Sequence, residues 1–197
     1  MIDLQKIETY QENNRIEAKR ATGGFPQSLW ETYSAFANTI GGIILLGVIE
    51  KRDHTLSPIG LPDPEGTVRE FWEKINDPKI VSVNILREQD VQISGEGERR
   101  IVAIEIPRAD RHDRPVYLGD DPYHGSYRRN GEGDYHCTAQ EVESMLRDQE
   151  DYTPDGTALD KFGLDCLSMR TVRNYRARVK QIRPGHIWKN CRILSSY

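Results

Sequence analysis

The chain has 197 residues, of which 37% are hydrophobic and 29% charged, a composition that suits one polar globular domain with an appendage and excludes a disordered tail. The longest apolar run, from Ile43 to Ile49, is too short to span a bilayer, and the first residues lack the pattern of a secretion signal. Three dispersed cysteines, at 137, 166 and 191, exclude a disulfide scaffold. We therefore expect a cytoplasmic protein with no membrane partner.

Charge is distributed unevenly along the chain. The net charge of −4 by itself disfavours a nucleic-acid partner, and residues 1–150 carry 18 basic and 27 acidic side chains. The stretch from Cys166 to the end, in contrast, carries eight Lys or Arg and neither Asp nor Glu. This asymmetry predicts either a surface for an anionic partner or a basic helix that packs on acidic residues elsewhere.

The first elements are a short strand, a helix and a buried strand. Residues 16–19 form the expected strand, and residues 23–26 form a loop from which Ser28 is expected to cap a helix. Apolar residues at a helical spacing predict that this helix runs from Leu29 to Ile40 and buries one face, formed by Leu29, Tyr33, Phe36, Ala37 and Ile40. Gly41 is expected to end it in a left-handed conformation, and residues 43–49 to follow as one strand buried on both faces.

The middle of the domain alternates short strands and helices. A second helix is predicted over residues 67–76, with Val68, Phe71, Trp72 and Ile75 facing inward, and a strand over residues 81–86. Two hairpins are expected, one pairing residues 91–94 with 100–106 and the other pairing 125–129 with 134–137. Thr138 and Glu141 have the spacing of a capping box for a helix that extends to about residue 147.

The order of these elements predicts a mixed α/β (α+β) fold with a partly antiparallel sheet and packed helices. We place one domain at residues 1–148, an acidic linker with Pro154 and Gly156 at 149–163, and a basic helical segment at 164–197. Within that segment, Ser168 is expected to cap a helix from Met169 to about Ile182.

Three carboxylates form one candidate site. Glu17 lies in the first strand, Glu12 just before it and Glu50 at the end of the buried strand, so neighbouring strands can bring the three together. Clustered carboxylates are the ligands that Mg²⁺ or Mn²⁺ needs to promote phosphodiester cleavage, and all three are candidate catalytic and metal-binding residues. The alternative is that Glu17 pairs with a nearby cation such as Lys19 and that Glu50 is simply exposed.

Basic residues form the second candidate site. The hairpin sequence from Tyr127 to Tyr135 interleaves tyrosine with Arg128 and Arg129, a pattern that can contact phosphates and stack on bases. Strand alternation sends these two arginines to opposite faces, so only one is expected to point to a ligand; the alternative is pairing with Glu132 or Asp134. The C-terminal helix adds Arg170 and Arg173 on one face.

Other patterns restrict the chemistry. In Asn38-Thr39-Ile40-Gly41-Gly42 the glycines follow a helix and precede a strand, the reverse of a phosphate-binding loop, so we expect a helix cap that Asn38 can fix. The five histidines have no metal-ligand spacing with each other or with the cysteines, and no nucleophile motif is present.

Three segments together resemble the Schlafen-type AlbA_2 domain. They are Glu12-x4-Glu17-x-Lys19, then Ala35-Phe36-Ala37-Asn38-Thr39-x-Gly41-Gly42 running into Leu45-Leu46-Gly47-Val48, then Tyr127 to Tyr135. The resemblance covers about residues 10–148. It implies a DNA-binding or transcription-regulatory domain of a larger protein, and residues 165–188 resemble the start of the region that follows such domains.

The resemblance also implies a metal-dependent RNA-cleaving site at Glu12, Glu17 and Glu50, although Glu50 replaces the usual aspartate of the family. Three functions remain open. The first is a DNA- or RNA-binding module that uses Lys19, Arg20, Arg128, Arg129, Arg170 and Arg173. The second is a Mg²⁺- or Mn²⁺-dependent ribonuclease, and the third is a protein-interaction domain that forms a homo-oligomer through exposed strands.

Overall fold

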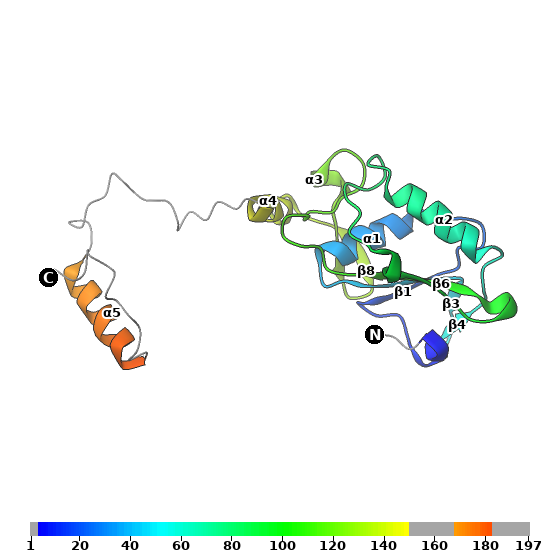
Figure 1. The fold of residues 1–197 in the computed structure, drawn as a ribbon, viewed down its shortest axis with the longest axis horizontal. Helices are drawn as coiled ribbons and strands as arrows, with labels where there is room; N and C mark the ends of the chain where they lie inside the picture. Colours follow the sequence, from blue (N-terminus) through cyan, green and yellow to red (C-terminus); the bar gives the residue numbers. More distant parts are fainter. Residues whose placement is uncertain (1–3, 150–167, 183–197) are drawn as a thin grey trace. The chain divides into compact units, whose positions relative to one another are not determined.

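The computed structural model describes residues 4–149 and 168–182, and its contacts divide the chain into two units, residues 1–151 and 152–197. The first unit contains a mixed sheet with helices packed on it, which is the α+β fold that the sequence predicts (Figure 1). Residues 150–163 of the predicted linker lie outside the described residues. None of the helices in the described ranges is long and apolar enough to cross a membrane.

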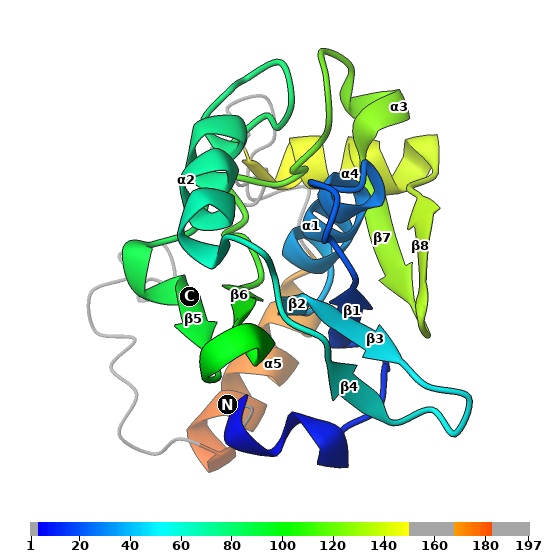
Figure 2. The same ribbon diagram turned by 90° about the vertical axis from the view of Figure 1, so that its right-hand side faces the viewer.

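A four-stranded sheet in the order β1-β2-β6-β5 forms the centre of the first unit (Figure 2). β1 (Ile16–Lys19) is parallel to β2 (Gly42–Leu46), and β6 (Ile101–Ile106) is antiparallel to both β2 and β5 (Val91–Ser94). The expected hairpin of β5 and β6 is therefore confirmed. Three short 3-10 helices complete this part: η1 (Leu4–Thr9), η2 (Glu88–Asp90) and η3 (Gly97–Arg99).

Alternation along the central strands divides the core into two layers. Ile44 and Ile104 face one side of the sheet, where α1 (Ser28–Asn38) and α2 (Pro64–Ile75) cover them. Leu45 and Ala103 face the other side, where they pack with Ile7 of η1 and with Leu56. Both faces of β2 are thus buried, because each has its own apolar cover.

The predicted strand over residues 43–49 is in fact two strands. Gly47, with φ of +81°, ends β2, and the chain continues as β3 (Val48–Glu50), which pairs with β4 (Leu56–Pro58) outside the four-stranded sheet. A Cβ atom at residue 47 would lie 3.0 Å from the carbonyl carbon of Gly60. The close approach and the left-handed backbone both require glycine, and the break redirects Glu50 away from the sheet.

The start of α1 and the exposure of Ile40 differ from the prediction. Gly41 ends it as expected, with φ of +73° and its N–H donating to the Phe36 carbonyl over 2.9 Å. Ser28, however, is the first helical residue and not a cap, and Gln27 precedes it with no side-chain capping bond. Ile40 lies beyond the last helical turn and is 43% exposed, so its predicted burial is wrong. The helical spacing no longer applies once the chain has left the helix.

The predicted strand over residues 81–86 does not form. Only Val81 makes an isolated bridge, to Leu118. Two polar groups of the following backbone are instead satisfied by one side chain, because the Tyr33 hydroxyl donates to the Val83 carbonyl over 3.2 Å and accepts from the Ile85 N–H over 3.0 Å. A buried tyrosine hydroxyl thus replaces a neighbouring strand.

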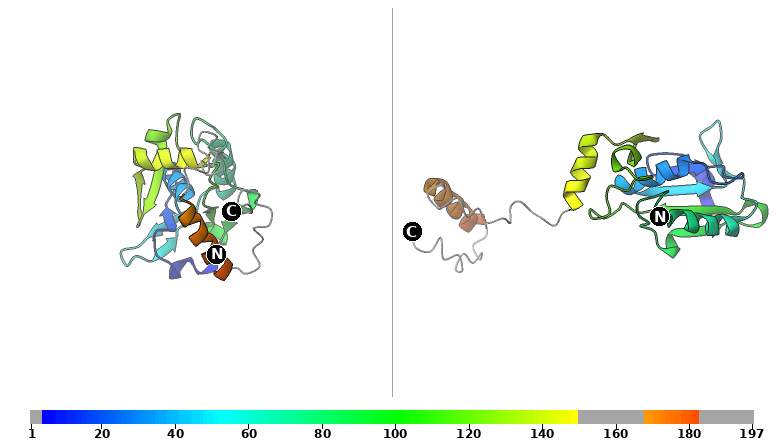
Figure 3. Two further views of the ribbon diagram at one scale, coloured as in Figure 1. Left: turned by 90° about the vertical axis from the view of Figure 1, so that its left-hand side faces the viewer. Right: turned by 90° about the horizontal axis from the view of Figure 1, so that it is seen from above.

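The second predicted hairpin is confirmed and packs against α1 (Figures 2 and 3). A short helix, α3 (Pro122–Gly125), precedes β7 (Tyr127–Asn130), which pairs with β8 (Gly133–His136). The capping box then starts α4 (Ala139–Gln149), with the Thr138 N–H donating to the Glu141 carboxylate over 2.7 Å. In the second unit, α5 (Met169–Ile182) begins after Ser168, whose hydroxyl accepts from the Thr171 N–H over 3.4 Å.

Candidate functional site

A buried ion-pair network joins the hairpin to the first strand. The Arg129 guanidinium on β7 lies 2.9 Å from the Glu17 carboxylate on β1 and 2.9 Å from the Asp134 carboxylate on β8. The side chain of Arg129 is only 1% exposed, and those of its two partners are 17% and 13% exposed. The guanidinium also donates to the Asn13 carbonyl over 3.0 Å and lies over the Phe36 ring. Arg129 is therefore held inside the fold.

Lys19 belongs to the same network. Its ammonium lies 3.1 Å from the second oxygen of Glu17 and donates to the Ser28 hydroxyl over 3.2 Å, and its side chain is 9% exposed. The structure thus supports the alternative in which Glu17 pairs with a nearby cation. Lys19 and Arg129 were both predicted to contact nucleic acid directly, whereas here their charged groups are bound to carboxylates of the protein. Their geometry suits positioning the surrounding loops.

The end of α1 anchors the hairpin through side-chain hydrogen bonds. The Asn38 amide donates to the carbonyls of Val116 and Tyr127 over 2.8 and 3.0 Å, and its oxygen accepts from the Val116 N–H over 2.8 Å. Ser34, one turn earlier, donates to the Val116 carbonyl and accepts from the Tyr127 N–H. Thr39 accepts from the Arg129 N–H over 3.0 Å. The sequence analysis identified Asn38 but not Ser34, which has no local signal.

The three candidate carboxylates lie near one another but each has its own partner. Glu12 accepts from the Ala18 N–H over 2.8 Å, and Glu50 contacts His54 at 2.8 Å. Burial raises the pKa of Glu12, the Ala18 hydrogen bond opposes that rise, and the negative charges of Glu17 and Glu50 add to it. The rise shows that the three charges are within electrostatic range.

This arrangement does not fit a metal ion as it stands. Both carboxylate oxygens of Glu17 bind cations of the protein, and an oxygen of Glu12 binds a backbone N–H. Among residues 4–149 and 168–182, no group of three His, Cys, Asp or Glu side chains is placed to hold a metal. Carboxylates that neutralise arginine and lysine have little capacity left for Mg²⁺ or Mn²⁺, which need several free oxygen ligands.

A basic hollow lies between β1 and the start of α1. It has a volume of about 430 Å³ and is formed by the end of β1 and the loop that follows, including Lys19, Arg20, Gly24, Phe25 and Ser28. None of the described residues that line it is acidic. Arg20 is exposed at its edge, and Phe25 is half-buried. The hollow therefore presents the charge of Arg20 beside an aromatic ring, whereas the charge of Lys19 is paired with Glu17.

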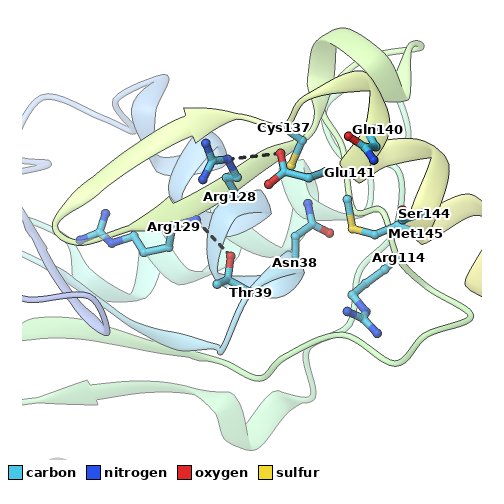
Figure 4. A pocket seen from close by; sticks show the side chains of 10 residues that line it. All are labelled: Asn38, Thr39, Arg114, Arg128, Arg129, Cys137, Gln140, Glu141, Ser144 and Met145. Atoms are coloured by element: carbon cyan, nitrogen blue, oxygen red, sulfur yellow. Dashed lines mark hydrogen bonds and ion pairs between the residues drawn. The ribbon is translucent and has the colours of Figure 1, made fainter.

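A second cavity, of about 480 Å³, lies between the hairpin, α4 and the segment before Val116 (Figure 4). Arg128 lines it on the opposite face of β7 from the buried Arg129, as the strand alternation predicts, and its side chain is 38% exposed. Arg114, which the sequence analysis did not single out, lines it as well. Cys137 also borders the cavity, and burial raises the pKa of its thiol to about 11, which does not suit a nucleophile.

The C-terminal basic residues belong to the second unit. Arg170 and Arg173 are exposed on α5. They are one turn apart, as the helical spacing predicts.

Comparisons with known proteins identify two families. The family described as Schlafen, AlbA_2 matches residues 12–138, and the one described as a domain of unknown function (DUF8451) matches residues 143–194. No curated protein matches the chain. Among solved structures, the chain is similar to the N-terminal domain of a RecG-related protein from Nitrosomonas europaea, determined by solution NMR. The two share 31% identity over 68% of this chain and 90% of that one, with a TM-score of 0.48.

Proposed function

The chain belongs to the Schlafen AlbA_2 family, and from that premise we propose that it is a nucleic-acid-binding module of a larger protein. The hollow beside Arg20 is the observation that carries this proposal. The exposed cation Arg20 and the first turn of α1 border it, with no acidic side chain among its lining residues; Lys19 lines it as well, with its ammonium paired to Glu17. Phosphate groups are attracted both by such cations and by the partial positive charge of a helix start.

The hollow also has an aromatic ring at its edge, over which the Lys74 ammonium lies 5.3 Å from the ring centroid. Phe25 lies at its edge, with its ring 6.3 Å from Trp30 and 6.2 Å from Phe71, so the aromatic group is fixed by the core. Aromatic rings next to a basic groove bind single strands by stacking, without a strict sequence preference. The net charge of the first unit opposes binding elsewhere, so contact is expected at this hollow and at exposed cations such as Arg128, Arg170 and Arg173.

Fluorescence anisotropy with labelled single- and double-stranded DNA and RNA, over a salt series and in chelator, tests the proposal. Affinity should fall steeply as salt rises, because released counterions drive phosphate binding. Arg20→Gln should weaken binding and reduce the slope of log affinity against log salt by about 0.7–0.9 per lost contact. Arg99→Gln, at an exposed site on η3 away from the hollow, is the matched control. Salt-insensitive binding, or equal affinity for both variants, would contradict the proposed surface.

The ribonuclease function has one feature in its favour, that Glu12 lies within electrostatic range of both Glu17 and Glu50. Because Glu17 also holds Arg129, loss of cleavage in Glu17→Gln would not distinguish chemistry from folding. Glu50→Gln avoids this problem, since the partner of Glu50 is the exposed His54. Mn²⁺-dependent RNA cleavage that Glu50→Gln abolishes would establish a nuclease, and cleavage that survives the substitution points to a contaminant.

The oligomerising interaction domain stays a prediction, to be decided by light scattering of the full chain.

A further inference from the structure

The two tyrosines of the β7–β8 hairpin have different surroundings, although they lie on paired strands (Figure 2). Tyr127 is used by the fold, because its hydroxyl donates to the Glu31 carboxylate on α1 and its ring centroid lies 4.3 Å from that of His136. Tyr135, in contrast, is 54% exposed, and no described residue bonds its hydroxyl or stacks on its ring. The hairpin therefore leaves one of its two aromatic rings available for contact with another molecule.

A glycine on the same strand fixes the position of the Tyr135 ring. Residues 133 and 135 are two apart on β8, so they lie on the same face of the hairpin. A Cβ atom at Gly133 would lie 2.6 to 2.9 Å from ring and hydroxyl atoms of Tyr135, which means that the ring lies directly over the glycine. An aromatic ring that is held in place before a ligand arrives loses little conformational freedom on binding.

The opposite strand supplies two polar side chains beside this ring. Arg128 pairs with Tyr135 in the register of the hairpin, and Asn130 pairs with Gly133. Directly paired residues are neighbours on one face, so both side chains lie next to the ring. Asn130 is exposed, and its side-chain amide bonds none of the described residues. We refer to the surface formed by Arg128, Asn130, Gly133 and Tyr135 as the Tyr135 face.

From this geometry we infer that the Tyr135 face is a stacking site for a base of single-stranded nucleic acid. The inference rests on the proposed function and gives it a second contact, distinct from the hollow beside Arg20. Every base has a flat aromatic face that can stack on an exposed ring, without a strict sequence preference. The Asn130 amide has both donors and an acceptor for the edge of such a base. A base on Tyr135 must be unstacked from its neighbours, which a single strand permits and an intact duplex does not.

The charges near the Tyr135 face favour contact through a base over contact through phosphates. Arg128 is paired with Glu141, and Glu132 is exposed in the turn of the hairpin. One cation beside two carboxylates leaves no excess of positive charge, which phosphate binding requires. Stacking does not have this requirement. Arg20 and Tyr135 should therefore affect binding differently, Arg20 through its dependence on salt and Tyr135 through its dependence on the base.

Anisotropy titrations of the full chain with a labelled single strand, and with the same strand carrying abasic sites, test the stacking site. Tyr135→Ser should lower the affinity for the complete strand by about 5- to 150-fold, the range that corresponds to the loss of one stacked base. Its affinity for the abasic strand should equal that of the native chain. Tyr135→Phe, which keeps the ring, should bind both strands as the native chain does. The salt dependence should be unchanged in Tyr135→Ser and reduced in Arg20→Gln.

Gly133→Ala is an independent variant that keeps the tyrosine but displaces its ring. Residue 133 is not among the glycines with positive φ, so alanine suits the backbone there. The substitution should weaken binding of the complete strand, and it should have no further effect when combined with Tyr135→Ser. Thermal unfolding of each variant verifies that it is folded before affinities are compared.

Three results would overturn the stacking site. Equal affinity of Tyr135→Ser and the native chain for the complete strand, with weaker binding by Arg20→Gln, would overturn it and leave the proposed function intact. An equal loss of affinity for the complete and abasic strands would show that Tyr135 does not act through a base. Self-association of the native chain that Tyr135→Ser abolishes, measured by light scattering, would assign the Tyr135 face to contact between two copies. The absence of binding to any strand would instead overturn the proposed function, and the stacking site with it.

Discussion

The guanidinium of Arg129 lies 2.9 Å from the carboxylate of Glu17, a residue 112 positions earlier in the chain. This ion pair connects the β7–β8 hairpin to the edge strand of the sheet across the end of α1. The same guanidinium binds Asp134, and the Lys19 ammonium binds Glu17, so two cations neutralise two carboxylates in a largely buried network. The hairpin is thereby fixed, and with it the position of Arg128 at the cavity.

Replacing Arg129 with alanine should strongly destabilise the domain. Removal of one partner from a buried ion pair leaves uncompensated charges and costs about 3–5 kcal/mol. Urea unfolding measures this loss. Arg128→Ala, at the exposed pair with Glu141, should cost at most about 1 kcal/mol. Combining Arg129→Met with Asp134→Asn should recover much of the stability, since Glu17 keeps its pair with Lys19 and no charge is then stranded. A loss below about 1 kcal/mol for Arg129→Ala would show that the network contributes little.

Substitution of Asn38 by alanine should also destabilise the fold. The change leaves the Val116 N–H and the Tyr127 carbonyl without their partner, and each unsatisfied buried group costs about 1–3 kcal/mol. We expect a loss of about 2–4 kcal/mol in the free energy of unfolding. The control is Asn76→Ala, at an exposed amide that donates to the Trp72 carbonyl and accepts from the Asn84 side chain. Similar losses for the two variants would contradict a specific anchoring role for Asn38.

Glu12 should make stability depend on pH in a defined direction. Its pKa is raised above the ordinary 4.5 in the folded protein, first by burial and then by the charges of Glu17 and Glu50. The folded state therefore binds more protons than the unfolded state between these two pKa values, and the contribution of Glu12 to stability falls as pH rises through that window. The free energy of unfolding of Glu12→Gln, relative to that of the native chain, should accordingly be higher at pH 7 than at pH 4.

Unfolding curves of both proteins at the two pH values measure this difference. Glu88→Gln, at an exposed position on η2, is the matched control for the loss of one carboxylate. An equal difference in free energy of unfolding between Glu12→Gln and the native chain at pH 4 and pH 7 would show that the folded environment of Glu12 does not disfavour its charge.

Cys137 should react slowly with thiol reagents in the folded protein. Its pKa is raised to about 11 by burial and, to a lesser extent, by the charge of Glu141, from an ordinary value of 9.0. Two pKa units reduce the thiolate fraction at pH 8 by about 100-fold, because each unit is a factor of ten. Labelling with a thiol-reactive disulfide, in a chain with Cys166→Ser and Cys191→Ser, measures the rate. Rapid labelling without urea, at the rate seen in urea, would contradict this burial.

Several elements follow from the sequence because their signals are local. The helical spacing of Leu29, Tyr33 and Phe36 predicts α1, and Gly41 has the expected left-handed conformation, although the helix already ends at Asn38. The capping box at Thr138 predicts the start of α4. In each case residues within one or two turns of the chain determine the conformation, so the pattern is visible without tertiary contacts.

The sequence predicts less of the structure where contacts with another part of the chain determine the local conformation. The expected strand over residues 81–86 is replaced by backbone bonds to the Tyr33 hydroxyl, and the strand over residues 43–49 is divided because Gly47 lies against Gly60. Neither partner is near in sequence. The Nε of Arg114 is buried without a hydrogen-bond partner among the described residues. This depends likewise on what surrounds it in space, so no sequence pattern around residue 114 indicates it.

The sequence by itself determined the α+β order of elements, the family resemblance and the candidate residues, because periodicity, turn residues and short motifs encode them locally. It also determined that Arg128 and Arg129 face opposite sides of a strand. Only the tertiary structure decided which of the two is buried, since that depends on the hairpin packing against α1 and on carboxylates from β1 and β8. The same packing turned Glu17 from an expected metal ligand into the partner of an arginine, because a charge inside a protein must be neutralised by whatever lies beside it.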